Sequence, residues 1–311
     1  MTKYAVARIF RGVVTALAAV IVTFAMVRLL PGDPVTVFLG DYATPEAKEA
    51  LRRAMGLDRP LMVQLALYLK DVIAGEMGAS LRTGEPVRSA ILRAFGPTLQ
   101  LAAASMVVAA LVALPLGVYA ARRRNQLGDV LAMVFAVAGR SVPHFWLGIL
   151  GLLVFALRLH WVPVVGSQVA SPIDVLRGLV LPALVLGSTE AALLTRLTRS
   201  SMLDTLSQDY VRTARAKGLR ERRVLYNHAL RNAFTSVWTA TGLSFGRLLG
   251  GSIVVEKVFT RVGLGQLLVE SIGSRDYPMI QGLVLTFTTI MIACNLVVDV
   301  GYGLLDPRIR R

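Results

Sequence analysis

The chain has 311 residues, of which 55% are hydrophobic and 17% are charged, and its formal net charge is +15. A soluble domain has about 45–50% apolar and about 25% charged residues, so this chain is unusually apolar. The composition excludes a disordered chain and a collagen, and the single cysteine, Cys294, excludes an intrachain disulfide scaffold. The excess of basic residues would also suit a nucleic-acid-binding protein, so the position of the charge decides the class.

Six stretches are long and apolar enough to cross a bilayer as helices, which takes about 20 residues each. They are residues 9–30, 97–119, 130–157, 179–197, 237–255 and 279–305. A backbone in lipid must satisfy its own hydrogen bonds, so the predicted fold class is an all-α integral membrane protein with six transmembrane helices. The first stretch follows basic residues, as in a signal peptide, but no small-residue cleavage site follows it. We therefore expect it to remain in the protein.

The distribution of Lys and Arg predicts that both termini are cytoplasmic. With the N-terminus inside, the cytoplasmic segments hold 18 basic and 5 acidic residues, and the outer segments hold 13 basic and 12 acidic residues. The opposite topology would export most of the positive charge. Because the membrane spans divide the basic residues and no aromatic platform is interleaved with them, a nucleic-acid partner is not expected.

These assignments divide the chain into four parts. Residues 1–30 form the first transmembrane helix, 31–96 an extracytoplasmic segment, 97–305 a core of five helices, and 306–311 a cytoplasmic tail. Apolar patches at residues 47–54 and 63–73 predict short helices within the extracytoplasmic segment.

The cytoplasmic segment 198–235 is strongly basic and is expected to form two helices joined at a glycine. Gly218, preceded by Lys217, is a good helix stop, because glycine adopts the left-handed backbone and a cation suits the negative end of a helix. Apolar or small residues fall on one face of the first helix: Leu206, Tyr210, Val211 and Ala214.

The second helix of this segment is expected from about residue 220 to 232, with Val224, Leu225 and Leu230 facing inward. The resulting apolar ridge could enter a groove on another protein. The alternative is a basic loop that holds the orientation of the chain and contacts anionic lipid.

Motifs of catalysis and cofactor binding are absent from the sequence. No phosphate-binding loop is present, so the chain is not expected to hydrolyse ATP by itself. The three histidines, His144, His160 and His228, are far apart, and none has a second ligand at metal-binding spacing. The sequence therefore predicts neither an enzyme nor a metal site.

Ionisable residues within membrane spans usually face the interior of the bundle or water. Glu190 and Asp299 could pair with Arg140 or Arg247, either as a packing ion pair or along a pathway. Polar residues in spans could line a hydrated pathway or form hydrogen bonds between helices. The candidate pathway residues are Ser141, His144, Glu190, Thr239, Ser244, Asn295 and Asp299.

Motifs along the whole chain resemble those of binding-protein-dependent ABC importer permeases. The glycine elbow, YVRTARAKGL at 210–219 followed by HALRNA at 228–233, resembles their coupling loop. The resemblance is to the first (B-type) permease subunit of the dipeptide, oligopeptide, glutathione and nickel group. Further motifs occur in the family's order: PGDP (31–34), GLDRPL (56–61), GEMGAS (75–80), PTLQL (97–101), SVPHFW (141–146), RSSML (199–203), GGSIVVE (250–256), RDYP (275–278) and DPR (306–308).

The resemblance implies the ABC type I importer permease fold, with residues 97–305 as its core, in the bacterial cytoplasmic (inner) membrane. The implied partners are a second homologous permease subunit, an extracytoplasmic solute-binding protein and two ABC ATPase subunits. Those ATPases would bind ATP and Mg, and this chain would hold no cofactor. The implied ATPase-coupling residues are Tyr210, Ala214, Arg215, Ala216, Lys217, Gly218 and Leu219.

Peptides are the first substrate class that the resemblance implies, with nickel, glutathione or opines as alternatives. Two other classes of protein remain open. One is an ATP-independent secondary transporter in which Glu190 and Asp299 relay protons, and the other is a membrane scaffold protein. The chain departs from the family pattern at two usual prolines. Ser236 replaces one, so the second elbow helix is expected to run on into the fifth span, and Val262 replaces the other in the outer turn at 259–265.

Overall fold

The computed structural model describes residues 2–29, 33–40, 42–163 and 172–305, and the regular structure in these ranges is helical. The only strand-like pairing within them is an isolated bridge between Ala79 and Pro86. The predicted all-α fold class is therefore confirmed. The chain divides into two compact units: unit 1 is Met1–Thr98 with Val262–Ile292, and unit 2 is Leu99–Arg261 with Ala293–Arg311.

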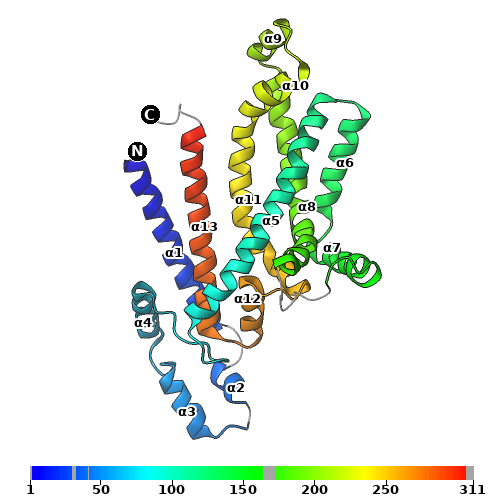
Figure 1. The fold of residues 1–311 in the computed structure, drawn as a ribbon. Coiled ribbons are helices and arrows are strands. Elements are labelled where there is room, and N and C mark those ends of the chain that lie inside the picture. Colours follow the sequence, from blue (N-terminus) through cyan, green and yellow to red (C-terminus); the bar gives the residue numbers. More distant parts are fainter. Residues whose placement is uncertain (1, 30–32, 41, 164–171, 306–311) are drawn as a thin grey trace. The chain divides into compact units, whose positions relative to one another are not determined.

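Unit 1 combines the N-terminal helices with one later segment, Val262–Ile292. Helices α3 and α4 occur where the two apolar patches predicted short helices. Helix α3 starts after Thr44, whose hydroxyl accepts a hydrogen bond from the backbone N of Ala47 at 3.3 Å. The elements are α1 (Thr2–Leu29), α2 (Pro34–Leu39), α3 (Pro45–Ala54), α4 (Leu61–Ala74), the start of α5 (Val87–Arg122), α12 (Leu264–Gly273) and the first part of α13 (Tyr277–Leu305) (Figure 1).

The core of unit 1 joins segments that are far apart in sequence. Val87 and Ile91 of α5 are buried against Leu264 of α12 and Leu283 of α13. The hydroxyl of Thr98 accepts a hydrogen bond from the backbone N of Leu264 at 2.8 Å, which caps the first turn of α12. The outer turn that holds Val262 therefore leads directly into a capped helix.

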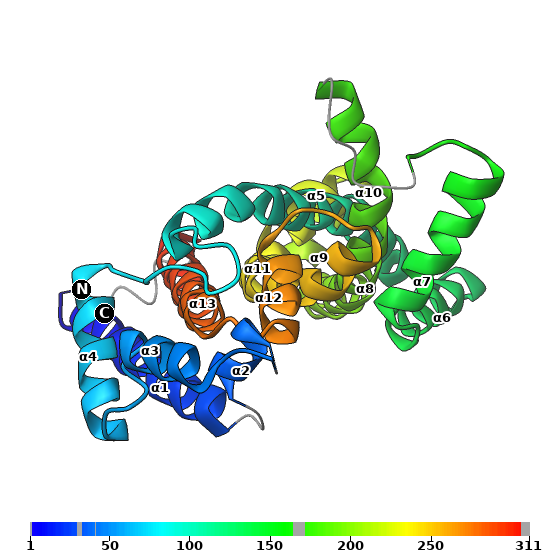
Figure 2. The same cartoon turned by 90° about the horizontal axis from the view of Figure 1, so that it is seen from below.

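Unit 2 contains most of the long helices. Helix α8 lies between α11 on one side and α6 on the other, as Figures 1 and 2 show, and it contacts both. The elements are the rest of α5, α6 (Leu127–Ser141), α7 (His144–Gly151), the π-helical η1 (Leu152–Arg158), α8 (Pro172–Leu206), α9 (Asp209–Ala216), α10 (Glu221–Arg223), the π-helical η2 (Val224–Leu230), α11 (Arg231–Val258) and the end of α13.

Close packing of α5 against α8 depends on a small residue. A Cβ atom added to Gly187 would lie 2.6 Å from the carbonyl oxygen of Ser105, well inside van der Waals contact. Around this contact, Ala109 and Ala113 of α5 pack on Ala191 and Leu194 of α8. Small residues let helix backbones approach closely, which favours helix association in a membrane.

Three helices in the described ranges are long and apolar enough to cross a membrane by themselves: Val87–Arg122, Ile173–Leu206 and Tyr277–Val298. They correspond to the second, fourth and sixth predicted spans. The first predicted span contains a shorter apolar helix, Phe10–Met26. The fifth corresponds to α11, which is 28 residues long but is not among the helices apolar enough to cross a membrane by themselves. Six spans therefore stay a prediction, as does the cytoplasmic position of the termini.

The third predicted span, residues 130–157, is interrupted near its middle. It is a helix pair, Leu127–Ser141 and His144–Arg158, bent by 95°. The break falls at Val142 and Pro143. Val142 has extended backbone angles (φ −90°, ψ 125°), as expected for the residue before a proline, whose ring disfavours the helical conformation there.

Candidate functional site

The predicted glycine elbow is present at one end of unit 2, where α9 and α10 lie beyond the ends of α8 and α11 (Figure 1). Helix α9 ends at Ala216, and Gly218 follows with φ of +75°, the left-handed conformation that favours glycine. A Cβ atom at Gly218 would meet nothing within 4 Å. The glycine is therefore required by the backbone angle and not by crowding.

Apolar side chains hold the elbow together from inside. Val211 and Ala214 of α9 are buried against Val224 of η2, and Leu206 and Leu219 pack around them. The inward orientation predicted for the second helix is confirmed at Val224. The sequence also predicted that an apolar ridge of the elbow could enter a groove on another protein. This prediction is wrong for Val211 and Ala214, because the second arm of the elbow already covers these side chains.

An ion pair spans the two arms of the elbow. The guanidinium of Arg215 donates from Nε and Nη2 to the two carboxylate oxygens of Glu221, at 3.2 and 2.9 Å. The hydrogen bond from Arg215 lowers the pKa of Glu221 below its ordinary value and raises the pKa of Arg215. Both side chains are about two-fifths exposed, so solvent screens the pair. It favours one angle of the elbow without burying a charge.

The outward face of the elbow is polar. Ala216, Lys217 and Gly218 are exposed, and Leu219 is half-buried. Tyr210 is exposed, and its hydroxyl accepts a hydrogen bond from Nδ2 of Asn232 at 2.6 Å. A protein that binds here meets a tyrosine, a glycine turn and several cations, and not an apolar ridge.

Past the elbow, the chain passes through η2 directly into α11, which continues without a break through Ser236. The prediction that the second elbow helix runs on when Ser236 replaces proline is confirmed. The elbow is therefore connected to a helix of 28 residues without an intervening loop.

Three of the candidate pathway residues, on α7, α8 and α11 of unit 2, have polar contacts with one another or with their neighbours. The carboxylate of Glu190 is 3.8 Å from Nη2 of Arg247, which confirms one of the pairings open from the sequence. The same Nη2 donates to the hydroxyl of Ser244 at 2.7 Å. His144, at the start of α7, has Nδ1 3.4 Å from the hydroxyl of Thr189, the neighbour of Glu190.

The remaining candidates do not join this group. The hydroxyls of Ser141 and Thr239 donate to carbonyl oxygens of their own helices, those of Val137 and Thr235, and do not form the hydrogen bonds between helices that were the alternative to a pathway role. Asn295 is exposed on α13. Asp299 also falls on α13, but its side chain lies outside the described residues.

Sequence reasoning missed a buried ion pair in unit 2. Asp129 of α6 is 3% exposed and accepts hydrogen bonds from Nε and Nη2 of Arg199 on α8, at 2.5 and 2.6 Å. The backbone N of Asn125 donates to the same carboxylate at 3.0 Å. This bidentate pair joins α6 and α8 through two residues that are 70 positions apart in the sequence.

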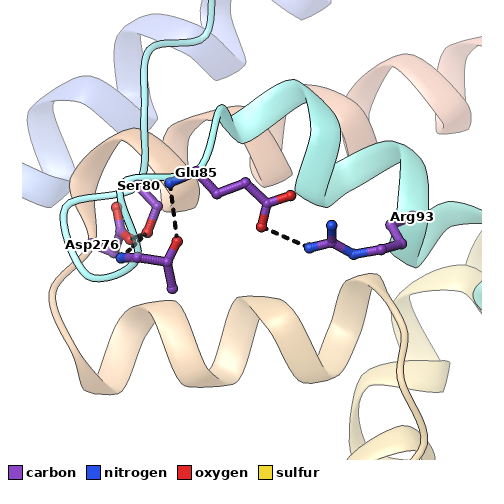
Figure 3. A network of polar contacts seen from close by, with 5 residues as sticks. Ser80, Glu85, Arg93 and Asp276 are labelled. Carbon is purple, nitrogen blue, oxygen red and sulfur yellow. Dashed lines mark hydrogen bonds and ion pairs between the residues drawn. The ribbon is translucent and has the colours of Figure 1, made fainter.

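A polar network in unit 1 was also missed. Ser80 and Asp276 belong to the motifs at 75–80 and 275–278, and Figure 3 shows their side chains pointing toward each other. The hydroxyl of Ser80 donates to Asp276, which also accepts from the backbone N of Leu81 at 3.2 Å and of Met279 at 3.3 Å. Nearby, Glu85 accepts a hydrogen bond from Arg93 at 2.7 Å, which lowers the pKa of Glu85.

No group of three or more His, Cys, Asp or Glu side chains that could hold a metal ion occurs in the described ranges. The chemistry that the described sites support is hydrogen bonding and ion pairing between helices.

Two family models match the chain. The binding-protein-dependent transport system inner membrane component matches residues 113–311, and the N-terminal model of the same transport-system membrane components matches residues 1–102. The glutathione transport system permease protein GsiC of Salmonella paratyphi A is 45% identical over 310 residues, covering 100% of this chain and 99% of that protein. GsiC of Escherichia coli strain K12 is 44% identical with the same coverage.

Solved structures agree on the fold. An inward-facing structure of the MetNI methionine ABC transporter matches with a TM-score of 0.56 at 17% identity, covering 70% of this chain and 96% of that one. An amino acid ABC transporter crystallised with histidines matches with a TM-score of 0.50 at 16% identity, covering 71% and 94%. The chain belongs to the binding-protein-dependent transport system inner membrane component family and is an ABC importer permease of the peptide and glutathione group, a multi-pass protein of the inner membrane.

Proposed function

We propose that this permease forms half of the translocation pathway for a small peptide, with glutathione as the first substrate to test. The predicted topology of six spans with both termini in the cytoplasm is part of the proposal. The substrate class is supported by the full-length similarity to GsiC, which is a glutathione transport system permease. Peptide remains the broader class, because glutathione is itself a peptide, and nickel and opines are the alternatives.

The same proposal assigns the elbow at 198–235 to the ATPase. The observation that carries it is the internal packing of Val211, Ala214 and Val224, which makes the elbow a small folded unit and not a flexible loop. This unit continues through η2 into α11. Movement of a docked ATPase would therefore reach a long helix of unit 2 through continuous helical backbone. The docking surface is the turn from Tyr210 to Leu219.

The proposed pathway group is Glu190, Arg247, Ser244 and His144 of unit 2. Arg247 is half exposed and Glu190 mostly buried, with side-chain exposures of 52% and 13%. An ion pair of 3.8 Å between partners so differently exposed leaves the arginine accessible to water and to a peptide carboxylate. Ser141, Thr239, Asn295 and Asp299 remain candidates on sequence alone.

Reconstituted uptake tests the function. The chain would be placed in liposomes with a second permease, two ATPases and a solute-binding protein, and uptake of labelled glutathione, a dipeptide and Ni²⁺ would be compared. We expect uptake of glutathione or the dipeptide that needs ATP and stops with vanadate. Uptake driven by a proton gradient alone would contradict the proposal.

Cross-linking tests the docking surface separately. Ala216→Cys places a thiol on the outward face of the elbow, and Leu127→Cys places one at the exposed first residue of α6 as a matched control. A short bifunctional reagent should join the ATPase to the first variant and not to the second. Equal cross-linking of both would remove the assignment of the elbow.

A further inference from the structure

A pocket in unit 1 is not used by the proposed function. It has a volume of about 470 Å³ and lies between the end of α1, α4, the loop after α3 and the start of α13. Two motifs from the sequence, at 56–61 and 275–278, supply part of its lining, including Arg59 and Tyr277. Such a volume is far more than one water molecule needs, which is about 10–15 Å³ on the same measure.

Two buried donors in this pocket have no acceptor. Gln281 is 7% exposed, and its Nε2 makes no hydrogen bond with any described residue. The same is true of Nη1 of Arg28, which is also buried. Buried polar groups are nearly always hydrogen-bonded, so a pair of unsatisfied donors lining one cavity points to a ligand with acceptor oxygens.

The guanidinium of Arg28 is held in place for such a ligand. Its Nε donates to Oε1 of Gln64 at 2.9 Å, and its face lies 3.6 Å from the ring centre of Phe24. Gln64 is fixed in turn by its own bond to the carbonyl of Arg59, at 2.8 Å. These contacts occupy the Nε and one face of the guanidinium and leave Nη1 for the pocket.

Tyrosines and unpaired charges complete the lining. Burial raises the pKa of Tyr68 to about 12, so its hydroxyl keeps its proton at neutral pH. Charges of both signs line the pocket, and none of these four forms an ion pair with a described residue: Arg53, Arg59, Asp71 and Glu76. A ligand that carries both an oxyanion and a cation matches this lining better than a simple anion does.

The surroundings favour a lipid as the source of that ligand. The pocket lies at the end of the apolar helix Phe10–Met26, next to Leu29, which is 81% exposed. Helix α4 also exposes large apolar side chains, with Met62 at 79% and Ile73 at 87%. Arginine and tyrosine at the end of an apolar helix are typical of the level of the phospholipid headgroups.

We propose that this pocket binds the zwitterionic headgroup of an amine-bearing phospholipid, with Arg28 and Gln281 as donors to the phosphodiester and Asp71 and Glu76 facing the ammonium. The same zwitterionic chemistry occurs in a free peptide, which would lack acyl chains to cover the apolar face of α1. Lipid and peptide are therefore separate arms of the test.

The test is native mass spectrometry of the full chain, extracted with its bound subunits and titrated with phosphatidylethanolamine, phosphatidylcholine or phosphatidylglycerol. We expect phosphatidylethanolamine to bind about tenfold more tightly than phosphatidylcholine, whose quaternary ammonium cannot donate hydrogen bonds. Gln281→Met and Arg28→Gln should each weaken its binding about tenfold. Arg88→Gln, which removes the same charge from an exposed position outside the pocket, should leave binding unchanged.

Three results would overturn the assignment: equal binding of the three lipids, unchanged binding in both pocket variants, or displacement of the lipid by glutathione or dialanine. The last would make the pocket a peptide site. If Arg28→Gln fails to fold, Gln281→Met decides alone, because it preserves side-chain length. Lipid binding is measured without ATP, so the outcome is independent of transport.

Discussion

The elbow of unit 2 and the loop of unit 1 that carries Ser80 both hold a sharp change of chain direction, and they do so by different means. In the elbow, Arg215 and Glu221 lie six positions apart and remain about two-fifths exposed. In the loop, Asp276 is 3% exposed and receives donors from residues almost 200 positions away. The polar contact of the elbow is local and exposed to solvent, in addition to its apolar packing, whereas the loop depends on distant groups around a buried carboxylate.

The two polar contacts differ in how much it costs to break them. A buried carboxylate with several donors is costly to break, because each donor would lose its partner away from water. An exposed pair contributes little and can change its geometry.

The largest effect is expected at the buried ion pair between Asp129 and Arg199. Asp129→Ala leaves the Arg199 guanidinium mostly buried without its partner, which typically destabilises by about 3–5 kcal/mol. We expect a large fall in the thermal unfolding temperature of the purified protein. The double variant Asp129→Ala with Arg199→Met should recover much of the loss, because no unpaired charge remains. A double variant as unstable as the single one would contradict this account.

Breaking the hydrogen-bond network around Asp276 should have the next largest effect. Asp276→Ala leaves the hydroxyl of Ser80 and the backbone N atoms of Leu81 and Met279 without their acceptor, which we expect to cost about 2–4 kcal/mol. Ser80→Ala removes only one donor and should cost about 1 kcal/mol. The measurement is again thermal unfolding. Equal losses in the two variants would mean that the backbone bonds contribute nothing.

The elbow, the Asp129–Arg199 pair and the Ser80–Asp276 contact also show which parts of the structure the sequence could predict. The elbow was predictable because its signals are local: Gly218 is a helix stop, and Ser236 permits the helix that a proline would interrupt. The pairs Asp129–Arg199 and Ser80–Asp276 were not, because each is brought together only by folding. The resemblance motifs contained Ser80 and Asp276, but nothing in either motif indicated that they meet.

The break in the third predicted span had a signal that was available. Residues 130–157 form a stretch longer than a bilayer needs, and Pro143 lies near its middle. Proline removes a helical hydrogen bond and restricts Val142 before it, yet neighbouring helices can also compensate for such a proline. Length and proline together favour a bend, and only the packing of α6 and α7 on α8 sets the 95° angle.

The third prediction concerns the backbone of the elbow. Gly218→Val puts a β-branched residue at φ of +75°, a strain of about 1–2 kcal/mol, although no neighbour would clash. We expect ATP-driven uptake to fall at least tenfold while the solute-binding protein still binds substrate. Gly218→Asn is the matched control, because asparagine tolerates the left-handed conformation, and it should retain most of the uptake. Unchanged uptake in Gly218→Val would remove the coupling role of the turn.

The smallest effect is expected at the exposed pair of the elbow. Because Arg215 lowers the pKa of Glu221, the pair stabilises the folded state at pH values above the ordinary pKa of 4.5, and this contribution is lost as the pH falls through the lowered value. Solvent screening limits it to about 0.5 kcal/mol. Glu221→Gln should therefore unfold at a slightly lower temperature than the wild type at pH 7, and the gap should close in the acid range below 4.5 and shrink in high salt. A gap that persists in acid would mean that Glu221 acts through packing and not through its charge.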